Sequence, residues 1–210
     1  MRLVIDKEPL RQILRWTQRA LITFAVVALG YCGFVLADGW MFQNREQRRL
    51  EQLLHDRRTA IGATRQTAAP AASTNPLPIG ADGLIGRIEI PRLGLSVIVV
   101  EGVDRRTLRR AAGHIPGTAF PGRSGNVGIS AHRDTFFRPL RNIRQDDIIT
   151  LTTLAGEYRY RVVSVKIVSP TDVAVLDPSE NEVLTLVTCY PFYFVGPAPS
   201  RFIVRAERSF

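Results

Sequence analysis

One segment near the N-terminus restricts the possible folds more than any other part of the sequence. Residues 20–37 read ALITFAVVALGYCGFVLA, an uncharged run of eighteen residues in a chain of 210. A helix that crosses the hydrocarbon core of a bilayer needs about 20 apolar residues, with about 17 as a lower bound. We therefore expect residues 20–37 to form one transmembrane helix.

A cleaved signal peptide is the main alternative for this segment. Its apolar core would be shorter, about 7–15 residues, and a small-x-small cleavage site would follow it. The observed run is longer, and the sequence LADGW at 36–40 is a poor cleavage site. We therefore predict an uncleaved anchor.

The charges that flank the segment predict its orientation. Basic residues are denser before it than after it; they are Arg2, Lys7, Arg11, Arg15 and Arg19 on one side and Arg45, Arg48 and Arg49 on the other. Because basic flanks stay in the cytoplasm, we expect the N-terminus inside and the rest of the chain outside. Trp16 and Trp40 bracket the segment, as interfacial aromatics do.

Composition divides the chain into four parts. We predict a cytoplasmic N-terminus at 1–19, a transmembrane anchor at 20–37, a stalk and flexible linker at 38–80, and a folded domain at 81–210. The linker is rich in Ala, Thr, Ser and Pro from Thr59 onward, a composition that cannot bury a core.

The positive charge does not indicate a nucleic-acid partner. The formal charge of +9 divides into 11 basic and 6 acidic residues at 1–80, and 17 basic and 13 acidic residues at 81–210. In the domain, arginines are mixed with acidic residues and form no stripe with stacking aromatics. The basic N-terminus is explained by membrane topology, and we predict no nucleic-acid binding.

The domain has the pattern of a mainly β protein. Short apolar runs separated by turn residues predict strands at 84–90, 95–100, 125–131, 148–153, 158–168, 183–188 and 202–206. A short helix is expected at 104–112, with Asp104 as its N-cap and Gly113 past its end. With so few helices, a closed or nearly closed β-barrel is the economical fold, because closure removes edge strands.

Three residues of the domain can perform acyl transfer. Cys189 is the only cysteine outside the apolar segment, His132 follows one predicted strand, and Arg201 precedes the last. A thiolate can attack a carbonyl, an imidazole can move protons, and a fixed cation can stabilise an oxyanion. Cys32 lies in the predicted span and cannot pair with Cys189, so export implies a free thiol, unusual outside the cytoplasm unless it reacts. A buried strand cysteine is the alternative.

Other polar residues compete for roles near this site. His114 could replace His132, although we favour a packed histidine that braces a loop. Asp134 could orient His132 or pair with a neighbouring arginine. We expect Asp146 and Asp147 to form a solvated turn and predict no metal site.

The motifs around these residues resemble the sortase family. They are TLVTC at 185–189, GISAHRDTFF at 128–137, GHIPGT at 113–118, YPFY at 190–193 and Arg201, and they look most like class D sortases. The resemblance covers roughly residues 84–208 and the anchor. One departure is Ser-Ala-His at 130–132, where Ala-Gly-His is commoner.

The resemblance implies a specific fold and reaction. It implies a closed eight-stranded sortase-like β-barrel with short helices, preceded by one transmembrane helix. Sortases cleave a C-terminal signal such as Leu-Pro-x-Thr-Gly or Leu-Pro-x-Thr-Ala, hold the threonine as a thioester and pass it to an amine. Cys189 is then the nucleophile, His132 the general acid and base, and Arg201 the oxyanion or substrate clamp. We also predict that Thr188 and Tyr190 contact the substrate, although Thr188 could equally be a strand residue with a satisfied hydroxyl.

The implied partners are an exported protein with a sorting signal, an envelope amine acceptor and the membrane, without a cofactor. Other classes fit less well: an L,D-transpeptidase would need a Ser-His-Gly-Cys sequence and a thiol oxidoreductase a resolving cysteine, and both are absent. A non-catalytic envelope barrel that binds sorting peptides remains the alternative. A Cys189→Ala variant separates the two, because a binder keeps its function whereas a transpeptidase loses turnover.

Overall fold

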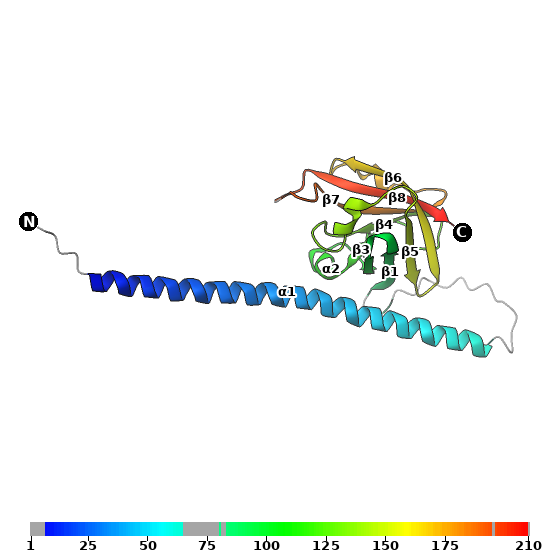
Figure 1. Cartoon of the computed structure of the whole chain (residues 1–210). Coiled ribbons are helices and arrows are strands. Elements are labelled where there is room, and N and C mark those ends of the chain that lie inside the picture. The colour runs from blue at the N-terminus through cyan, green and yellow to red at the C-terminus, as the bar shows by residue number, and fades with distance from the viewer. Residues whose placement is uncertain (1–6, 65–79, 81–82, 195, 210) are drawn as a thin grey trace, which may run out of the picture. The chain divides into compact units, whose positions relative to one another are not determined.

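The computed structural model describes residues 7–64, 80, 83–194 and 196–209. It contains two compact units, which are divided between Met41 and Phe42 within helix α1 (Lys7–Thr64). The β-barrel lies in the second unit (Figure 1). Positions 65–79 of the expected linker and 1–6 of the expected cytoplasmic segment lie outside the described residues.

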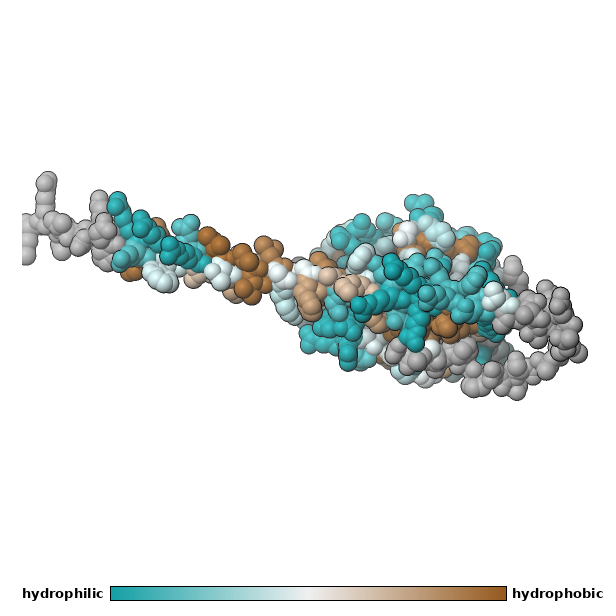
Figure 2. Space-filling view, turned by 90° about the horizontal axis from the view of Figure 1, so that it is seen from below, coloured by the Kyte–Doolittle hydropathy of each residue, from teal (hydrophilic) through white to brown (hydrophobic). Residues whose placement is uncertain are grey.

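Helix α1 contains the apolar run found in the sequence. Side chains throughout most of residues 20–37 are exposed, and the helix is long and apolar enough to cross a membrane by length and composition. Figure 2 shows these hydrophobic residues in brown, after a hydrophilic start in teal. Because the apolar surface lacks a polar face along this stretch, the helix suits a lipid environment.

Eight strands form a closed barrel in the order β1-β2-β3-β4-β7-β8-β6-β5. They are β1 (Leu84–Ile90), β2 (Leu95–Glu101), β3 (Ala112–His114), β4 (Gly125–Ser130), β5 (Ile148–Thr153), β6 (Glu157–Val168), β7 (Glu182–Tyr190) and β8 (Ser200–Ser209). Short helices connect some of them, namely α2 (Arg105–Arg110), η1 (Pro91–Leu93), η2 (Arg138–Asn142) and η3 (Val173–Leu176). The expected mainly β fold, a closed eight-stranded barrel after one apolar helix, is confirmed.

The strand directions are mixed. β2 and β3 run parallel, as do β4 and β7, whereas the other pairs are antiparallel. Parallel neighbours need a crossover connection, and β5 and β6 lie within the one that separates β4 from β7 in sequence. Figure 1 shows β7, β8 and β6 side by side. This arrangement places the sequence around His132 beside the sequence around Cys189.

The alternation along β7 and β8 separates the core from the site. Leu184 and Leu186 of β7 and Val204 and Ala206 of β8 belong to the barrel core. Successive strand residues face opposite sides of a sheet, so residues of the other parity face outward. Cys189 has that parity and is half-buried.

The region between β2 and β4 differs from the expectation in one respect. Asp104 does cap α2, because its side chain accepts hydrogen bonds from the amides of Arg106 and Thr107. The helix ends at Arg110, however, and residues 112–114 form strand β3. A parallel ladder with β2, in which Ala112 pairs with Val99, outweighs the local helical preference.

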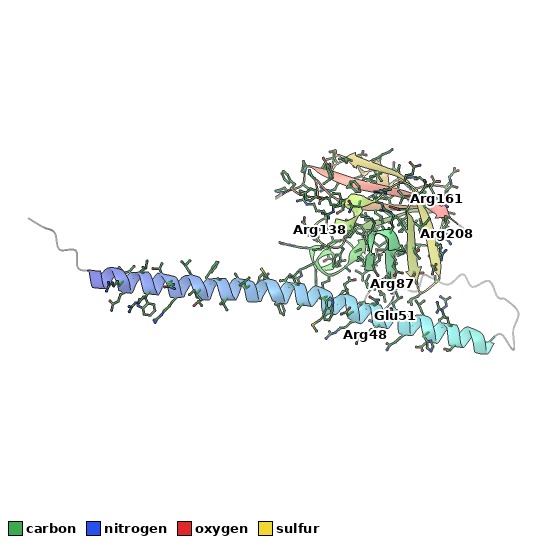
Figure 3. All side chains as sticks on the ribbon, in the orientation of Figure 1. Arg48, Glu51, Arg87, Arg138, Arg161 and Arg208 are labelled. Carbon is green, nitrogen blue, oxygen red and sulfur yellow. The ribbon has the colours of Figure 1, made fainter. Side chains whose placement is uncertain are left out.

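The second unit also includes the C-terminal part of α1. Leu50 is buried in a small cluster with Leu84 of β1 and Ile98 of β2. The Gln43 side chain accepts a hydrogen bond from the Ile98 amide (2.9 Å) and donates one to the Arg110 carbonyl (2.6 Å). Glu51 of α1 also forms a salt bridge with Arg87 of β1, with 3.4 Å between Oε1 and Nη1; both residues are labelled in Figure 3. This part of the helix therefore packs on the barrel and supplies polar partners to strand β2.

Candidate active site

Cys189 and Arg201 lie opposite each other on adjacent strands. The antiparallel register of β7 and β8 pairs Cys189 with Arg201 and continues to Tyr190 and Ser200. Directly opposite residues point to the same face, with Cβ atoms about 4.5–5.5 Å apart. Arg201 therefore lies inside β8 rather than before it, because the backbone ladder extends further than the apolar run in the sequence.

His132 is placed next to the same strand. It follows Ala131, whose amide donates to the Val187 carbonyl (3.2 Å) and whose carbonyl accepts from the Thr188 hydroxyl (2.7 Å). These two bonds fix the chain immediately before His132 beside the end of β7. The His132 side chain is exposed. The fold thus brings the segment that carries His132 next to the end of β7, where Cys189 is paired with Arg201.

Within the described part of the chain, no hydrogen bond joins the side chains of His132, Cys189 and Arg201 to one another. Arg201 is half-buried, and its Nη1 donates to the carbonyls of Ser200 (3.1 Å) and Ala198 (3.4 Å). These local bonds tie the guanidinium to the backbone at the start of β8. They leave the thiol and the imidazole available for a substrate.

Thr188 has a structural contact that explains its place in the motif. It is 2% exposed, and its hydroxyl bonds the Ala131 carbonyl as described above. Tyr190 stacks on Phe202 with ring centroids 6.2 Å apart and meets Phe192 edge-on at 6.1 Å. Contact of Thr188 and Tyr190 with a substrate stays a prediction.

Thr185, the first residue of the motif, links strand β7 to β4 four residues before Cys189. Its hydroxyl donates to the side-chain oxygen of Asn126 on β4 (2.7 Å). The Asn126 amide in turn donates to the carbonyls of Val175 and Asp177, in and just after η3. The pair therefore ties β4, β7 and the β6–β7 connection together.

His114 is a packed residue. It is 1% exposed, its Nδ1 lies 2.7 Å from a Glu101 carboxylate oxygen, and its Nε2 lies 2.9 Å from the Ala119 carbonyl. Its ring also stacks on Phe120 at 4.6 Å. With both ring nitrogens and one ring face occupied, His114 braces β2 and β3 against the following loop.

The neighbours of His132 also have defined partners. Asp134 lies 3.5 Å from the guanidinium of Arg133 and is 69% exposed, so it forms an exposed ion pair with Arg133. Arg133 itself is buried and bonds carbonyls of the β7–β8 loop. Sequence reasoning gave Arg133 no role of its own; its position directly after His132 was the only available signal.

The comparisons with known proteins agree with this architecture. Residues 88–209 match the family model described as the sortase domain, and the chain belongs to the sortase family. It is therefore a sortase-type cysteine transpeptidase. This decides between the enzyme and the non-catalytic binding barrel.

Individual relatives resemble the chain over different lengths. Sortase D of Bacillus subtilis (strain 168) is 32% identical over 191 residues, which cover 90% of this chain and 95% of the relative. Sortase A of Listeria monocytogenes is 30% identical over 112 residues, covering 51% of this chain and 50% of the relative.

Solved structures show the same fold. The Clostridium perfringens sortase D5 transpeptidase has a TM-score of 0.56 at 30% identity and covers 60% of this chain and 79% of its own. Sortase C2 of Group B Streptococcus pilus island 1 has a TM-score of 0.59 at 26% identity, with coverages of 75% and 98%. The likeness therefore extends across several classes of sortase.

Proposed function

We propose that this chain is a membrane-anchored transpeptidase that cleaves a C-terminal sorting signal of the Leu-Pro-x-Thr-Gly or Leu-Pro-x-Thr-Ala type and transfers the protein to an amine of the cell envelope. The observation that carries the proposal is the placement of three groups: Cys189 faces Arg201 across the β7–β8 ladder, and His132 follows the segment bonded to β7. Residues 20–37 anchor the enzyme, with 1–19 in the cytoplasm and the barrel outside.

In the proposed first half-reaction, the Cys189 thiolate attacks the threonine carbonyl carbon. Negative charge develops on the carbonyl oxygen, and Arg201 stabilises it by charge and directed hydrogen bonds. As the peptide C–N bond breaks, protonated His132 gives its proton to the leaving amine. The product is a thioester between the threonine and Cys189.

In the second half-reaction, an acceptor amine attacks the thioester. Neutral His132 takes a proton from the attacking nitrogen, and Arg201 again faces the oxyanion. Collapse of the tetrahedral intermediate forms the new amide bond and releases the Cys189 thiolate. The chemistry therefore needs no metal or organic cofactor, because each half-reaction moves one proton and one acyl group.

Trapping the intermediate tests the assignment of the nucleophile. The full-length chain in detergent is incubated with a sorting peptide and no acceptor amine, and intact and peptide mass spectrometry locate the adduct. We expect a thioester on Cys189 and none in Cys189→Ala, while Cys32→Ala, which changes the other thiol, reacts normally. An adduct elsewhere, or none in the unmodified enzyme, contradicts the proposal.

The two basic residues are separated by their different roles. Arg201→Lys keeps the charge but loses the planar donor fork, so we expect it to lose most activity, and Arg201→Ala to lose on the order of 100-fold or more. His132→Ala blocks protonation of the leaving amine, so acyl-enzyme formation itself fails. Near-normal turnover of Arg201→Ala would remove Arg201 from the site, and the same result for His132→Ala would assign proton transfer to another group.

A further inference from the structure

A buried arginine connects the two halves of the proposed site. The guanidinium of Arg133 donates from Nη1 to the carbonyl of Pro191 (2.9 Å) and from Nη2 to the carbonyls of Phe194 (2.7 Å) and Gly196 (3.0 Å). All three acceptors lie in the loop between β7 and β8. One side chain therefore gathers three carbonyls of this loop.

The charge of Arg133 is held mainly by these carbonyls. Arg133 is 6% exposed, and a buried cation requires hydrogen-bond partners to offset its lost hydration. Asp134 lies 3.5 Å from Nε, but its side chain is 69% exposed and therefore strongly hydrated. A guanidinium can only donate and a carbonyl can only accept, so the three loop carbonyls match the terminal nitrogens of Arg133.

The contact between Arg133 and the β7–β8 loop depends on these residue types. A guanidinium is a rigid planar fork that can direct several N–H groups at once, whereas an ammonium is a compact point charge. Gly196 has a φ of 111°, a backbone conformation that favours glycine, and its carbonyl is one of the acceptors. The Phe194 ring lies 5.9 Å from the guanidinium carbon of Arg133, which adds a cation–π contact.

Arg133 is directly bonded in sequence to His132, and the loop it holds joins Cys189 to Arg201. Displacement of this loop would move the ends of β7 and β8, where the thiol and the guanidinium of Arg201 lie opposite each other. The same displacement would change their positions relative to His132. The contact therefore spans both polypeptide segments that supply the site.

We propose that Arg133 is a positioning residue: its buried guanidinium fixes the β7–β8 loop against the segment that carries His132 and so sets the geometry in which Cys189 is acylated. Arg133 does not touch the reacting atoms. The inference rests on the proposed roles of His132, Cys189 and Arg201, and its test includes a measurement that does not depend on them.

Hydrogen exchange of the loop provides that measurement. In the full-length chain in detergent, Arg133→Lys, Arg133→Met and Arg133→Ala are compared with Arg138→Met, a change at an exposed arginine of η2 (Figure 3). We expect exchange in the 190–200 peptide to rise about tenfold or more in the three Arg133 variants and to stay normal in Arg138→Met. Arg133→Lys keeps the buried charge, so it separates bond geometry from charge loss.

Single-turnover kinetics test the consequence for the site. With a sorting peptide and no acceptor, the rate constant of Cys189 acylation should fall about tenfold or more in all three Arg133 variants, because small displacements of reacting groups slow bond formation strongly. The peptide concentration at half-saturation should change less than the rate constant. Rates are expressed per folded molecule, from circular dichroism, so that a loss of stability alone leaves them unchanged. Millimolar guanidinium should restore part of the rate in Arg133→Ala and none in Arg133→Lys.

Two results would overturn the inference. One is normal acylation in Arg133→Lys and Arg133→Met; the other is slow acylation with unchanged exchange of the loop, because Arg133 would then act by another route. The parent proposal fails separately, if Cys189→Ala still forms the adduct or if the unmodified enzyme forms none. In that case the exchange experiment still decides whether Arg133 holds the loop.

Discussion

At the scale of single residues, the motif around the cysteine has a physical explanation beyond its chemistry. Thr185 and Thr188 are both buried, and each uses its hydroxyl to bond the neighbouring strand β4 or the residue after it. A buried hydroxyl that lacks a partner is costly, so threonine is suited to these positions only because the acceptors are there. The motif therefore fixes the position of β7 beside the segment that leads to His132.

The pair Asp146–Asp147 shows where single-residue reasoning was wrong. A solvated turn was expected for both, and Asp146 is exposed with a φ of 68°, but Asp147 is buried. Asp147 accepts hydrogen bonds from Arg92, including Nη2 at 2.5 Å, and from the amide of Arg144 (2.8 Å). The Arg92 guanidinium, fifty-five residues away in sequence, holds the pKa of Asp147 below its usual value.

The ion pair between Asp147 and Arg92 predicts a pH dependence of stability. Because the folded-state pKa of Asp147 is lowered, its contribution is complete above the ordinary carboxyl pKa of about 4 and is lost as the pH falls through the folded value. Asp147→Asn should cost about 1–2 kcal/mol of unfolding free energy at pH 7, since Arg92 is partly exposed, and less at pH 3.

Denaturant unfolding at the two pH values checks the Asp147 prediction. Asp146→Asn is the matched control, because asparagine tolerates the positive φ and the side chain is 70% exposed. It should change stability by less than about 0.5 kcal/mol. A constant difference between Asp147→Asn and the unmodified protein at both pH values contradicts the assigned ion pair.

At the scale of secondary-structure elements, the strands and the first helical cap were predictable, but the pairing was not. Alternation and turn residues predicted β1 and β5 with the bounds that the structure has, and β2, β4, β6 and β7 to within two residues. Strand β3 was missed because three residues form a strand only through the parallel ladder with β2. The register that places Cys189 opposite Arg201 depends on contacts across β7 and β8, which no local pattern records.

Helix α1 contains a second feature that local patterns did not reveal. The sequence predicted a stalk in this region, whereas Leu50 is 1% exposed and packs with β1 and β2. Leu53, three residues later on the same helix, is 38% exposed. Composition could not show which leucine meets the barrel, because that depends on the barrel surface.

Substitution of the two leucines tests this contact. Leu50→Ala removes buried methyl groups and should lower the unfolding free energy of the barrel by about 2–3 kcal/mol, whereas Leu53→Ala should cost less than about 1 kcal/mol. Denaturation of the full-length chain in detergent, followed by the β signal in circular dichroism, measures both. Equal effects of the two substitutions would show that Leu50 has no special contact with the barrel.

At the scale of the whole molecule, the sequence defined an apolar helix and a catalytic barrel, and membership in the sortase family agrees with that division. The anchor and its orientation come from length and flanking charge alone. We propose that the basic N-terminal segment remains in the cytoplasm and that the barrel operates outside.

Reporter fusions test this topology. Alkaline phosphatase fused after Ser209 should be active, because the enzyme folds only outside the cytoplasm, and a fusion after Arg19 should be inactive. Mass spectrometry of the membrane fraction should recover the 1–19 segment on the mature protein. Release of a soluble form that starts near Asp38 would instead indicate a cleaved signal.

The position of β8 in the barrel has a consequence for the order of assembly. Strand β8 is the last strand of the barrel among the described residues, and it lies between β7 and β6. If the barrel crosses the membrane from its N-terminal side onward, Cys189 emerges before β8. The cross-strand partner of Cys189, Arg201, belongs to β8. Strand β8 also pairs with β6, where Val168 lies opposite Arg201 from 33 positions earlier in the chain, and such long-range pairing is slow. Under the proposed topology, the nascent enzyme acquires its complete site only when β8 has docked between β7 and β6.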